Sequence, residues 1–376
     1  MPGIALASSA PYSRTRLNIL ALLTDGFGAV GGIAQYNRDL MSALAQSSLV
    51  ESVIALPRFG AASKKLPVKI TQLSPSGGRI GWSTHAAALA LRQQFDVIFC
   101  GHINAAPVAA ALAKATFTRL WLQVHGFEAW SARNGAIRYA VESADLITAV
   151  SRHTRRRLLD WANIEPWRVR VLPNTFGKDF APRPRRPDLV RHFGLFGAKV
   201  ILTVGRIVSA ERYKGQDRVI AALPDVIARC PEAIYLIVGS GDDIPRLEFE
   251  ARSKGIADQV IFAGHVPASE LPDYFALADV FAMPSTGEGF GIVFLEAARS
   301  GLAVIGGNRD GSADALADGE IGKVIDPDDR EQLVGALVTA LDRRGPISGT
   351  SVDRFSADNF ARHVDDLVQD LTWLSR

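Results

Sequence analysis

The hydrophobic positions of this 376-residue chain form short continuous runs, and longer stretches with helical spacing lie between them. Runs that are apolar throughout and rich in β-branched residues are typical of strands covered on both faces. In the first half they fall at 17–23, 52–57, 96–100, 120–124, 146–150 and 169–172. In the second half they fall at 200–204, 234–238, 260–262, 279–283, 303–306 and 322–325.

Helical periodicity separates many of these runs, at 34–44, 82–94, 219–228, 294–299 and 330–341. Strands that alternate with helices build parallel, doubly wound sheets. The proline-rich basic segment Pro182–Pro187 interrupts the alternation, which then starts afresh. We therefore predict an α/β protein with two Rossmann-like domains, residues 1–180 and 181–355, followed by an amphipathic helix over 356–376.

Composition narrows the class of protein. A chain with 48% hydrophobic and 22% charged residues is not largely disordered, and it is longer than the about 250–300 residues that one core supports. Two cysteines, Cys100 and Cys230, suit buried apolar groups in a reducing cytoplasm rather than a disulfide framework. No run approaches the ~20 apolar residues of a membrane span, and we interpret residues 1–13 as a loose tail, not a signal peptide.

Charge is divided unevenly between the predicted domains. Residues 1–180 contain 20 lysines and arginines against 10 acidic residues, a net charge of +10, whereas residues 181–376 contain 22 against 29, a net charge of −7. The formal charge of +3 for the whole chain conceals this asymmetry. A basic half joined to an acidic half indicates that the first half faces an anionic partner.

One basic segment alternates arginine with tryptophan. It runs from Arg152 to Trp161, and Trp167, Arg168 and Arg170 follow it. This composition suits the headgroup layer of a membrane, and it is equally that of a solvated helix face. Nucleic acid is the weaker option because no readout motif accompanies the basic residues.

Glycines at strand ends are the first candidate binding residues. Gly31 and Gly32 precede a predicted helix, where backbone amides can approach an anion, although a plain tight turn explains them equally well. Their spacing is not that of a dinucleotide-binding fingerprint. Gly239, Gly241 and Asp242 follow a strand of the second half and leave room for a base or ribose, which is a weak signal by itself.

Two cations follow the first strand of the second half. Arg206 and Lys214 are eight positions apart across one predicted loop. At the carboxyl end of a strand both can reach a diphosphate, although solvated loop cations are the more frequent explanation for such residues.

The strongest signal is the segment 284–297, where a glycine-rich loop joins a strand to a helix that starts near Gly291. Free amides at a helix start can hold a phosphate without a metal, and the candidates are Gly289, Phe290, Gly291, Ile292 and Val293. Glu288 and Glu296 flank them and can accept hydrogen bonds from sugar and ribose hydroxyls. An acidic first turn that complements the helix dipole explains Glu288, but neither the loop glycines nor Glu296.

Other polar residues at strand ends are weaker candidates. His125 lies at the edge where α/β proteins bind ligands, and a structural histidine is an equally good explanation. His102 and Asn104 are placed similarly. Asp326 and Asp328 form a pattern that can hold a divalent metal, but acidic capping of the next helix is the ordinary explanation. We predict no metal site.

Together these residues resemble the retaining glycosyltransferases of family four, which have the GT-B fold. The most specific element is Glu288 and Glu296 within Glu-Gly-Phe-Gly-Ile-Val-Phe-Leu-Glu. The supporting elements, in the family's order, are Gly31-Gly32, His125-Gly126, Val150-Ser151, Pro173-Asn174, Gly205-Arg206, Lys214-Gly215, Gly239-Ser-Gly-Asp242 and Phe262-Ala-Gly-His-Val266. The resemblance covers almost the whole chain.

The resemblance implies two domains that face each other across a cleft, with the last helix returning to the first domain. A nucleotide-sugar, with GDP, UDP or ADP as its nucleotide, would lie mainly on the second domain, and the acceptor on the first. Arg206 and Lys214 would neutralise the departing diphosphate, and the amides of residues 291–293 would contact phosphate or sugar. Glu296 would bind ribose and Glu288 the transferred sugar.

The resemblance also implies that His125 sits against the sugar or its phosphate, and that Gly31 and Gly32 close over the diphosphate. The anomeric configuration would be retained by front-side attack, and the main physical contribution would be stabilisation of negative charge on the leaving diphosphate. The resemblance implies no cofactor and no metal.

The spacing from Arg206 to Lys214 is longer than the commonest family pattern, with Glu211-Arg-Tyr before Lys-Gly. This form, together with Gly307-Asn-Arg-Asp-Gly-Ser312, resembles an exopolysaccharide branch of bacterial mannosyltransferases. The leading hypothesis is a GDP-mannose-dependent hexosyltransferase that acts on a polyprenyl-diphosphate saccharide in the cytoplasm, peripheral to the plasma membrane. The alternatives are a nucleotide-sugar 2-epimerase and a non-catalytic nucleotide-sugar-binding protein.

Overall fold

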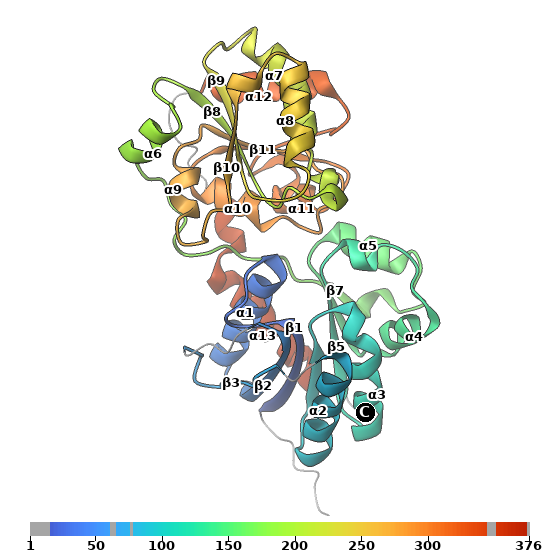
Figure 1. The fold of residues 1–376 in the computed structure, drawn as a ribbon. Coiled ribbons are helices and arrows are strands. Elements are labelled where there is room, and N and C mark those ends of the chain that lie inside the picture. The colour runs from blue at the N-terminus through green and yellow to red at the C-terminus, as the bar shows by residue number, and fades with distance from the viewer. Residues whose placement is uncertain (1–15, 61–64, 76–77, 344–350, 374–376) are drawn as a thin grey trace, which may run out of the picture.

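The computed structural model describes residues 16–60, 65–75, 78–343 and 351–373. The predicted loose tail and the last three residues of the predicted final helix therefore lie outside the described residues. Figure 1 shows two lobes, each built on one sheet with helices on both sides. The first lobe holds β1 to β7 and the second holds β8 to β13.

The first sheet has seven parallel strands in the order β3-β2-β1-β4-β5-β6-β7. They are β1 (Leu17–Asp25), β2 (Val50–Phe59), β3 (Ile70–Gln72), β4 (Val97–Cys100), β5 (Arg119–Val124), β6 (Leu146–Ala149) and β7 (Val169–Val171). The helices of this lobe are α1 (Gly32–Gln46), α2 (Gly78–Arg92), α3 (Ala106–Thr116), α4 (Gly135–Ser143) and α5 (Arg152–Leu159).

The second sheet has six parallel strands in the order β10-β9-β8-β11-β12-β13. They are β8 (Lys199–Val204), β9 (Ala233–Val238), β10 (Val260–Gly264), β11 (Val280–Met283), β12 (Ala303–Gly307) and β13 (Lys323–Ile325). The helices are α6 (Pro187–His192), α7 (Gln216–Ile227), α8 (Ile244–Ser253), α9 (Leu271–Phe275), α10 (Ile292–Arg299), α11 (Ser312–Ala315) and α12 (Arg330–Leu341).

All twelve predicted strands are present, and their ends differ from the prediction by two residues at most. Strand β3 is not among the predicted ones, because its sequence Ile-Thr-Gln has one apolar residue and so forms no continuous apolar run. Helices α3, α4, α6, α8, α9 and α11 lie outside the predicted helical ranges. The alanine-rich sequence of α3 is apolar on most sides, so its helical period is weak. Cys100 and Cys230 are buried free thiols, as expected.

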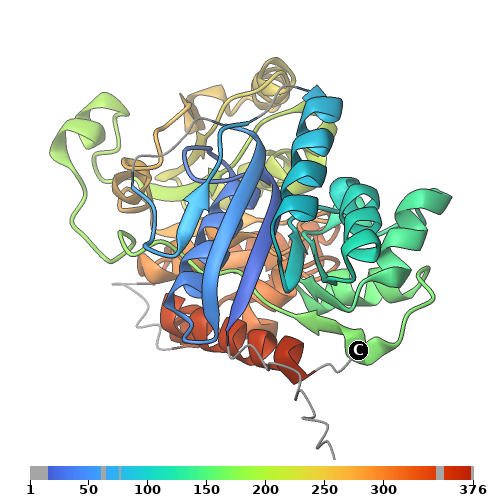
Figure 2. The same cartoon turned by 90° about the horizontal axis from the view of Figure 1, so that it is seen from below.

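The final helix, α13 (Ala357–Trp373), crosses from the second lobe and packs beneath the first sheet, which confirms the predicted return (Figure 2). The Phe360 ring meets the Tyr36 ring of α1 edge-on at 5.9 Å. Asp365 accepts a hydrogen bond from Ser47, and Asp370 lies 2.6 Å from Arg170. Its buried apolar face comprises Phe360, Val364, Leu367, Val368 and Leu371.

We predict that Leu367→Ala lowers the free energy of unfolding of the first lobe by about 2–5 kcal/mol, the usual cost of an unfilled leucine site. Leu367 is only 4% exposed. Gln369→Ala, on the exposed side of the same helix, should stay within about 0.5 kcal/mol of wild type. Denaturant unfolding would measure both. Equal, small losses would show that α13 does not support the first lobe.

Candidate active site

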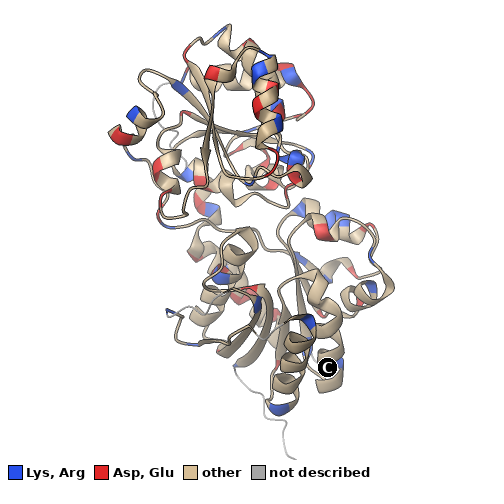
Figure 3. Cartoon of the chain, in the orientation of Figure 1, with Lys and Arg blue, Asp and Glu red and all other residues tan. Residues whose placement is uncertain are grey.

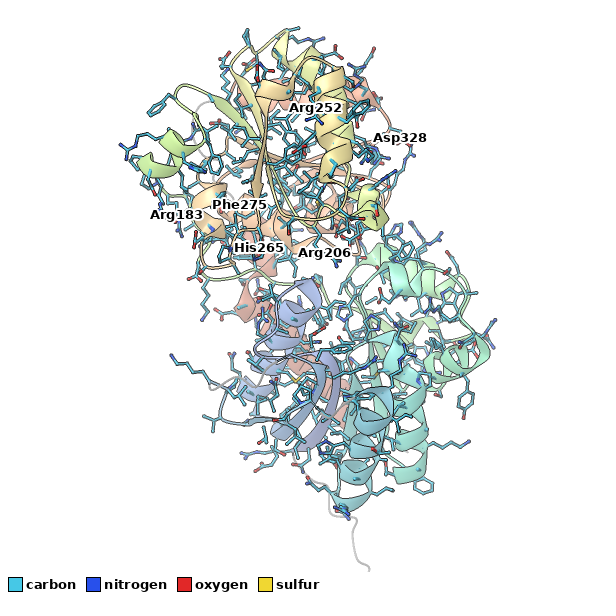
Figure 4. All side chains as sticks on the ribbon, viewed as in Figure 1. Arg183, Arg206, Arg252, His265, Phe275 and Asp328 are labelled. Atoms are coloured by element: carbon cyan, nitrogen blue, oxygen red, sulfur yellow. The ribbon has the colours of Figure 1, made fainter. Side chains whose placement is uncertain are left out.

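The carboxyl ends of the strands of the two sheets face each other, so the loops that follow them meet between the lobes (Figure 1). In parallel α/β sheets this edge is where ligands bind. The loop after β11, residues 284–291, lies at the centre of this region and carries Glu288. Figure 4 shows Arg206 on the rim of the second lobe that faces the first.

Lys214 and Glu288 form a close ion pair, in which the Lys214 ammonium donates to Glu288 Oε1. Their side chains are 13% and 15% exposed. Burial by itself would lower the pKa of Lys214, but Glu288 and the neighbouring Tyr213 and Glu211 carry that pKa above its ordinary value. Lys214 is therefore a charged donor held at the base of the loop.

Arg206 pairs with Glu211, and the two differ strongly in exposure. The Arg206 side chain is 75% exposed, whereas Glu211 is 12% exposed. The second carboxylate oxygen of Glu211 lies 3.7 Å from Lys214 Nζ. The structure thus joins the two predicted diphosphate cations through one acid.

Helix α10 begins at Ile292 after Gly291, close to the predicted start. Gly291 has φ 88° and provides no capping side chain, and the first amides of a helix have no intrahelical acceptor. The amides of Ile292 and Val293 are thus available to a ligand. The Phe290 ring is buried against Phe355 at 5.5 Å, so its backbone amide, as predicted from the sequence, is the part of this residue that is a candidate contact.

The two lobes are in close contact at Gly289. A Cβ on Gly289 would lie 1.8 Å from the carbonyl oxygen of His125, and a Cβ on Gly126 would lie 2.7 Å from Gly289 Cα. Thr154 Oγ1 lies 3.5 Å from the Gly289 oxygen. A side chain at Gly289 would hold the lobes apart, so close packing of the lobes requires glycine at this position.

His125 is fixed in the first lobe beside this contact. Its Nε2 lies 2.9 Å from the carbonyl oxygen of Gly101, so Nε2 carries the proton and Nδ1 is left as an acceptor. Glu128 accepts from the backbone amide of His125 at 2.6 Å, and the Tyr36 ring packs edge-on at 5.1 Å. Burial lowers the pKa of His125, against the opposing effect of Glu128. The imidazole is therefore neutral at pH 7.

Glu296 lies in α10 and faces α1 of the other lobe. Among the residues that the structure describes, its carboxylate has no hydrogen-bond partner. Burial raises the pKa of Glu296 to about 7, and the Asp39 carboxylate adds to the rise. Asp39 accepts from Gln35 at 2.8 and 2.9 Å, and burial raises its pKa to about 6. Glu296 is thus a partly buried acceptor with spare capacity.

The other predicted glycine contacts differ in their structural reasons. No atom lies within 4 Å of the position that a Cβ would take on Gly31 or Gly32. Neighbouring atoms therefore leave room for a ligand to approach these two glycines. A Cβ on Gly239 would lie 1.8 Å from the Gly205 oxygen, and one on Gly241 2.0 Å from the Ile207 oxygen. These last two glycines let neighbouring loops pack, whatever else they contact.

Asp242 and Val266 also have clear structural contacts. Asp242 accepts from the backbone amide of Ser209 at 2.9 Å and from its hydroxyl at 2.7 Å, and these bonds lower its pKa. Val266 is buried beyond β10. The binding roles predicted for both residues remain predictions.

Asp310 is a site residue that the sequence did not single out. Its buried carboxylate accepts from the Glu288 amide at 2.7 Å, from the Ser285 hydroxyl at 2.8 Å and from the Ser312 amide at 2.9 Å. The Gly311 amide in turn donates to the backbone carbonyl oxygen of Glu288 at 2.8 Å. Asp310 therefore fixes the backbone of the Glu288 loop. Its only sequence signal was a place within the Gly307–Ser312 segment.

The basic segment of α5 is largely engaged by protein groups. Arg152 pairs with Asp314 (2.5 Å) and Asp318 (2.7 Å) of the second lobe. Arg155 donates to the Val169 oxygen at 2.7 Å. Figure 3 shows Lys and Arg positions gathered along α5, near the second lobe. A bridge between the lobes explains Arg152, and bonds within the first lobe explain Arg155.

The Asp326–Asp329 segment behaves as a cap. Asp329 accepts from the Gln332 amide at 3.0 Å at the start of α12, as expected, and Asp326 and Asp328 pair with Arg309. Over the described ranges no group of three or more His, Cys, Asp or Glu residues is arranged to hold a metal ion. Independence of metal remains a prediction.

Comparisons with known proteins agree with this geometry. The model of "Glycosyltransferase Family 4" matches residues 30–176, and that of "Glycosyl transferases group 1" matches residues 194–347. A crystal structure of Anabaena HepE in complex with UDP and glucose superimposes with a TM-score of 0.74 at 19% identity, covering 94% of this chain and 100% of that one. This likeness shows the fold.

Two curated relatives are closer in sequence. A GDP-mannose-dependent alpha-(1-6)-phosphatidylinositol monomannoside mannosyltransferase of Mycolicibacterium smegmatis is 34% identical over 68% of this chain and 71% of its own length. The enzyme of Corynebacterium glutamicum that acts on the monoacylated form is 31% identical over 83% and 86%.

The fold and the facing loops define a GT-B glycosyltransferase. The chain belongs to glycosyltransferase family 4, as the sequence motifs predicted.

We predict that Asp310→Asn weakens donor binding about tenfold, because its amide group leaves one loop donor unpaired in a buried place. Asp326→Asn on the neighbouring exposed loop is the matched control and should change affinity less than twofold. Isothermal titration with a nucleotide-sugar would measure both variants. If Asp310→Asn has a lower melting temperature than wild type but binds donor with the same affinity, Asp310 supports only the fold.

We also predict that donor affinity falls about tenfold between pH 8 and pH 6, since Glu296 takes up a proton near pH 7 and, in the ribose-binding role that we predict, its carboxylate would be the form that accepts both hydroxyls. An intact nucleotide-sugar without acceptor avoids titration of a terminal phosphate. Glu296→Gln should bind more weakly, with no such slope. Because burial disfavours the carboxylate, Glu296→Gln should also melt higher than wild type at pH 8, and this difference should shrink as the pH falls from about 7 and vanish near the ordinary carboxyl pKa of 4.5. A slope that persists in this variant would contradict the assignment.

Proposed function

We propose that the chain transfers mannose from GDP-mannose, with retention of anomeric configuration, to a lipid-linked saccharide acceptor in polysaccharide biosynthesis. The observation that carries the proposal is the Lys214–Glu288 pair beside the free amides of α10, opposite His125. Such an arrangement brings a cation, helix amides and a sugar-hydroxyl acceptor to one place. The two mannosyltransferase relatives support the choice of sugar and base.

On the donor side, charge stabilisation is the main task. As the bond between sugar and diphosphate breaks, negative charge grows on the leaving oxygen. In this proposal Lys214, Arg206 and the amides of Ile292 and Val293 stabilise that charge, which their ion pairs and the uncapped start of α10 support. Loss of one such preorganised donor costs roughly 3–4 kcal/mol of transition-state stabilisation in other enzymes. Neither a cofactor nor a metal is part of this proposal.

On the acceptor side, the first lobe offers polar groups beside His125. The His102 ring lies 6.2 Å from the His125 ring, and its Nδ1 accepts from the Asn104 amide at 3.1 Å. Arg133 donates to the Asn104 side chain at 3.2 Å and is not paired with a carboxylate among the described residues. An acceptor that carries a phosphate, as the names of the relatives indicate for theirs, suits this surface.

The exposed side chains of α5 and of the segment after it are the candidate contact with an anionic membrane. Arg156 and Arg157 are exposed, and Trp167 is 61% exposed. Their neighbours Arg152 and Arg155 are already engaged. Within the described part of the chain no helix has the length and apolarity to cross a bilayer. Peripheral binding through these side chains at the cytoplasmic face is what we propose.

A thermal-shift panel of GDP, UDP, ADP and their sugars tests the donor assignment, because a ligand of the folded state raises the melting temperature by mass action. We expect GDP and GDP-mannose to give the largest shifts, with or without EDTA, and transfer to a lipid-linked saccharide to follow for GDP-mannose. A larger shift with UDP ligands would contradict the choice of base. A shift that needs a divalent ion would contradict the metal-free site, and binding without transfer to any acceptor would favour a non-catalytic protein.

A further inference from the structure

The segment between the two diphosphate cations carries an acid that the proposed function leaves unused. Glu211 lies in the short 3-10 segment η4 (Ser209–Lys214). It pairs with Arg206, and its other oxygen lies 3.7 Å from Lys214 Nζ. A carboxylate between two cations competes with any anion that those cations bind. The presence of the Glu211 carboxylate in a diphosphate site therefore requires a physical explanation.

The backbone around Glu211 is held from both sides. At the start of η4, Ser209 donates twice to Asp242. At its end, the backbone carbonyl oxygen of Tyr213 accepts from the backbone amide of Thr286 at 2.9 Å. A Cβ on Gly287 would lie 2.6 Å from the Tyr213 ring. Glu211 is thus docked against the Glu288 loop, and its carboxylate stays in the site.

The four charged side chains of this cluster differ in their exposure to solvent. Lys214, Glu288 and Glu211 have side chains 13%, 15% and 12% exposed, whereas Arg206 is 75% exposed. Arg206 alone among them can turn through solvent toward a ligand at little cost in packing. The two cations and two acids cancel, so an arriving diphosphate meets no net charge until a cation is released.

We propose that Glu211 is the internal counter-ion of the diphosphate site. It holds Arg206 while the site is empty, gives Arg206 up to the diphosphate of the donor, and takes it back as the nucleoside diphosphate leaves. The proposal rests on the proposed function only in placing a diphosphate at Arg206 and Lys214. One anion replaces another in each step, so the product is held less tightly than two free cations would hold it.

The variant Glu211→Gln tests the exchange, because it keeps the shape and the hydrogen-bonding oxygen but removes the charge. Titration calorimetry with inorganic pyrophosphate, in EDTA and at low salt, should give about tenfold tighter binding than wild type. A disrupted loop would weaken binding, so tightening separates the exchange from damage to the fold. Glu248→Gln, an exposed acid of α8 that lies 3.7 Å from Arg252, should leave the affinity unchanged.

A double-mutant cycle with Arg206→Ala shows whether Glu211 acts through that arginine. Without Arg206 there is no cation to release, so Glu211→Gln should tighten binding less than about threefold. Equal tightening in both backgrounds would mean repulsion through space alone and would overturn the exchange. Unchanged or weaker pyrophosphate binding by Glu211→Gln, or a wild type that does not bind pyrophosphate, would overturn it too.

This cycle is independent of the sugar and the base. Pyrophosphate carries neither, so the result stands whichever nucleotide-sugar is the donor. Failure of the proposed function would appear separately, as the absence of transfer from every nucleotide-sugar by a wild type that still binds pyrophosphate. A further readout under turnover is product inhibition, which Glu211→Gln should strengthen by a similar factor.

Discussion

The ion pair between Lys214 and Glu288 is the contact on which the candidate site depends. It joins the loop after β8 to the loop after β11, and both partners are nearly buried. A buried charge pair is stable only while both members are present and well placed. The surrounding contacts supply that placement. Asp310 holds the Glu288 backbone from β12, and Tyr213 packs under Gly287.

The same loop also determines how the lobes meet. Gly289 lies one residue beyond Glu288 and touches the backbone of His125, so the donor loop and the first lobe are in contact at the site itself. The pairs of Arg152 with Asp314 and Asp318 bridge the lobes at a second point. Opening or closing of the lobes would therefore move His125 relative to Glu288.

Much of the fold was predictable, because continuous apolar runs mark buried parallel strands, and β3, which was not predicted, has no such run. Helix α3 was not predicted, because alanine on most of its sides weakens the helical period of its hydrophobic residues. For the site, the motif around Glu288 and Glu296 gave the residues, but not their partners. Asp310 and Glu211 act through contacts between loops far apart in sequence, and periodicity carries no record of such contacts. The bridge from Arg152 was likewise hidden within a segment whose charge favoured lipid or solvent.

The central claim is that this cluster holds the diphosphate of a nucleotide-sugar. Calorimetric titration of the wild-type chain with guanosine and with GDP, at the same pH and salt and in EDTA, tests it most directly. The account predicts that GDP binds at least about a hundredfold more tightly than guanosine, because the diphosphate would gain Lys214, Arg206 and the α10 amides. Equal affinities for the two ligands would contradict it.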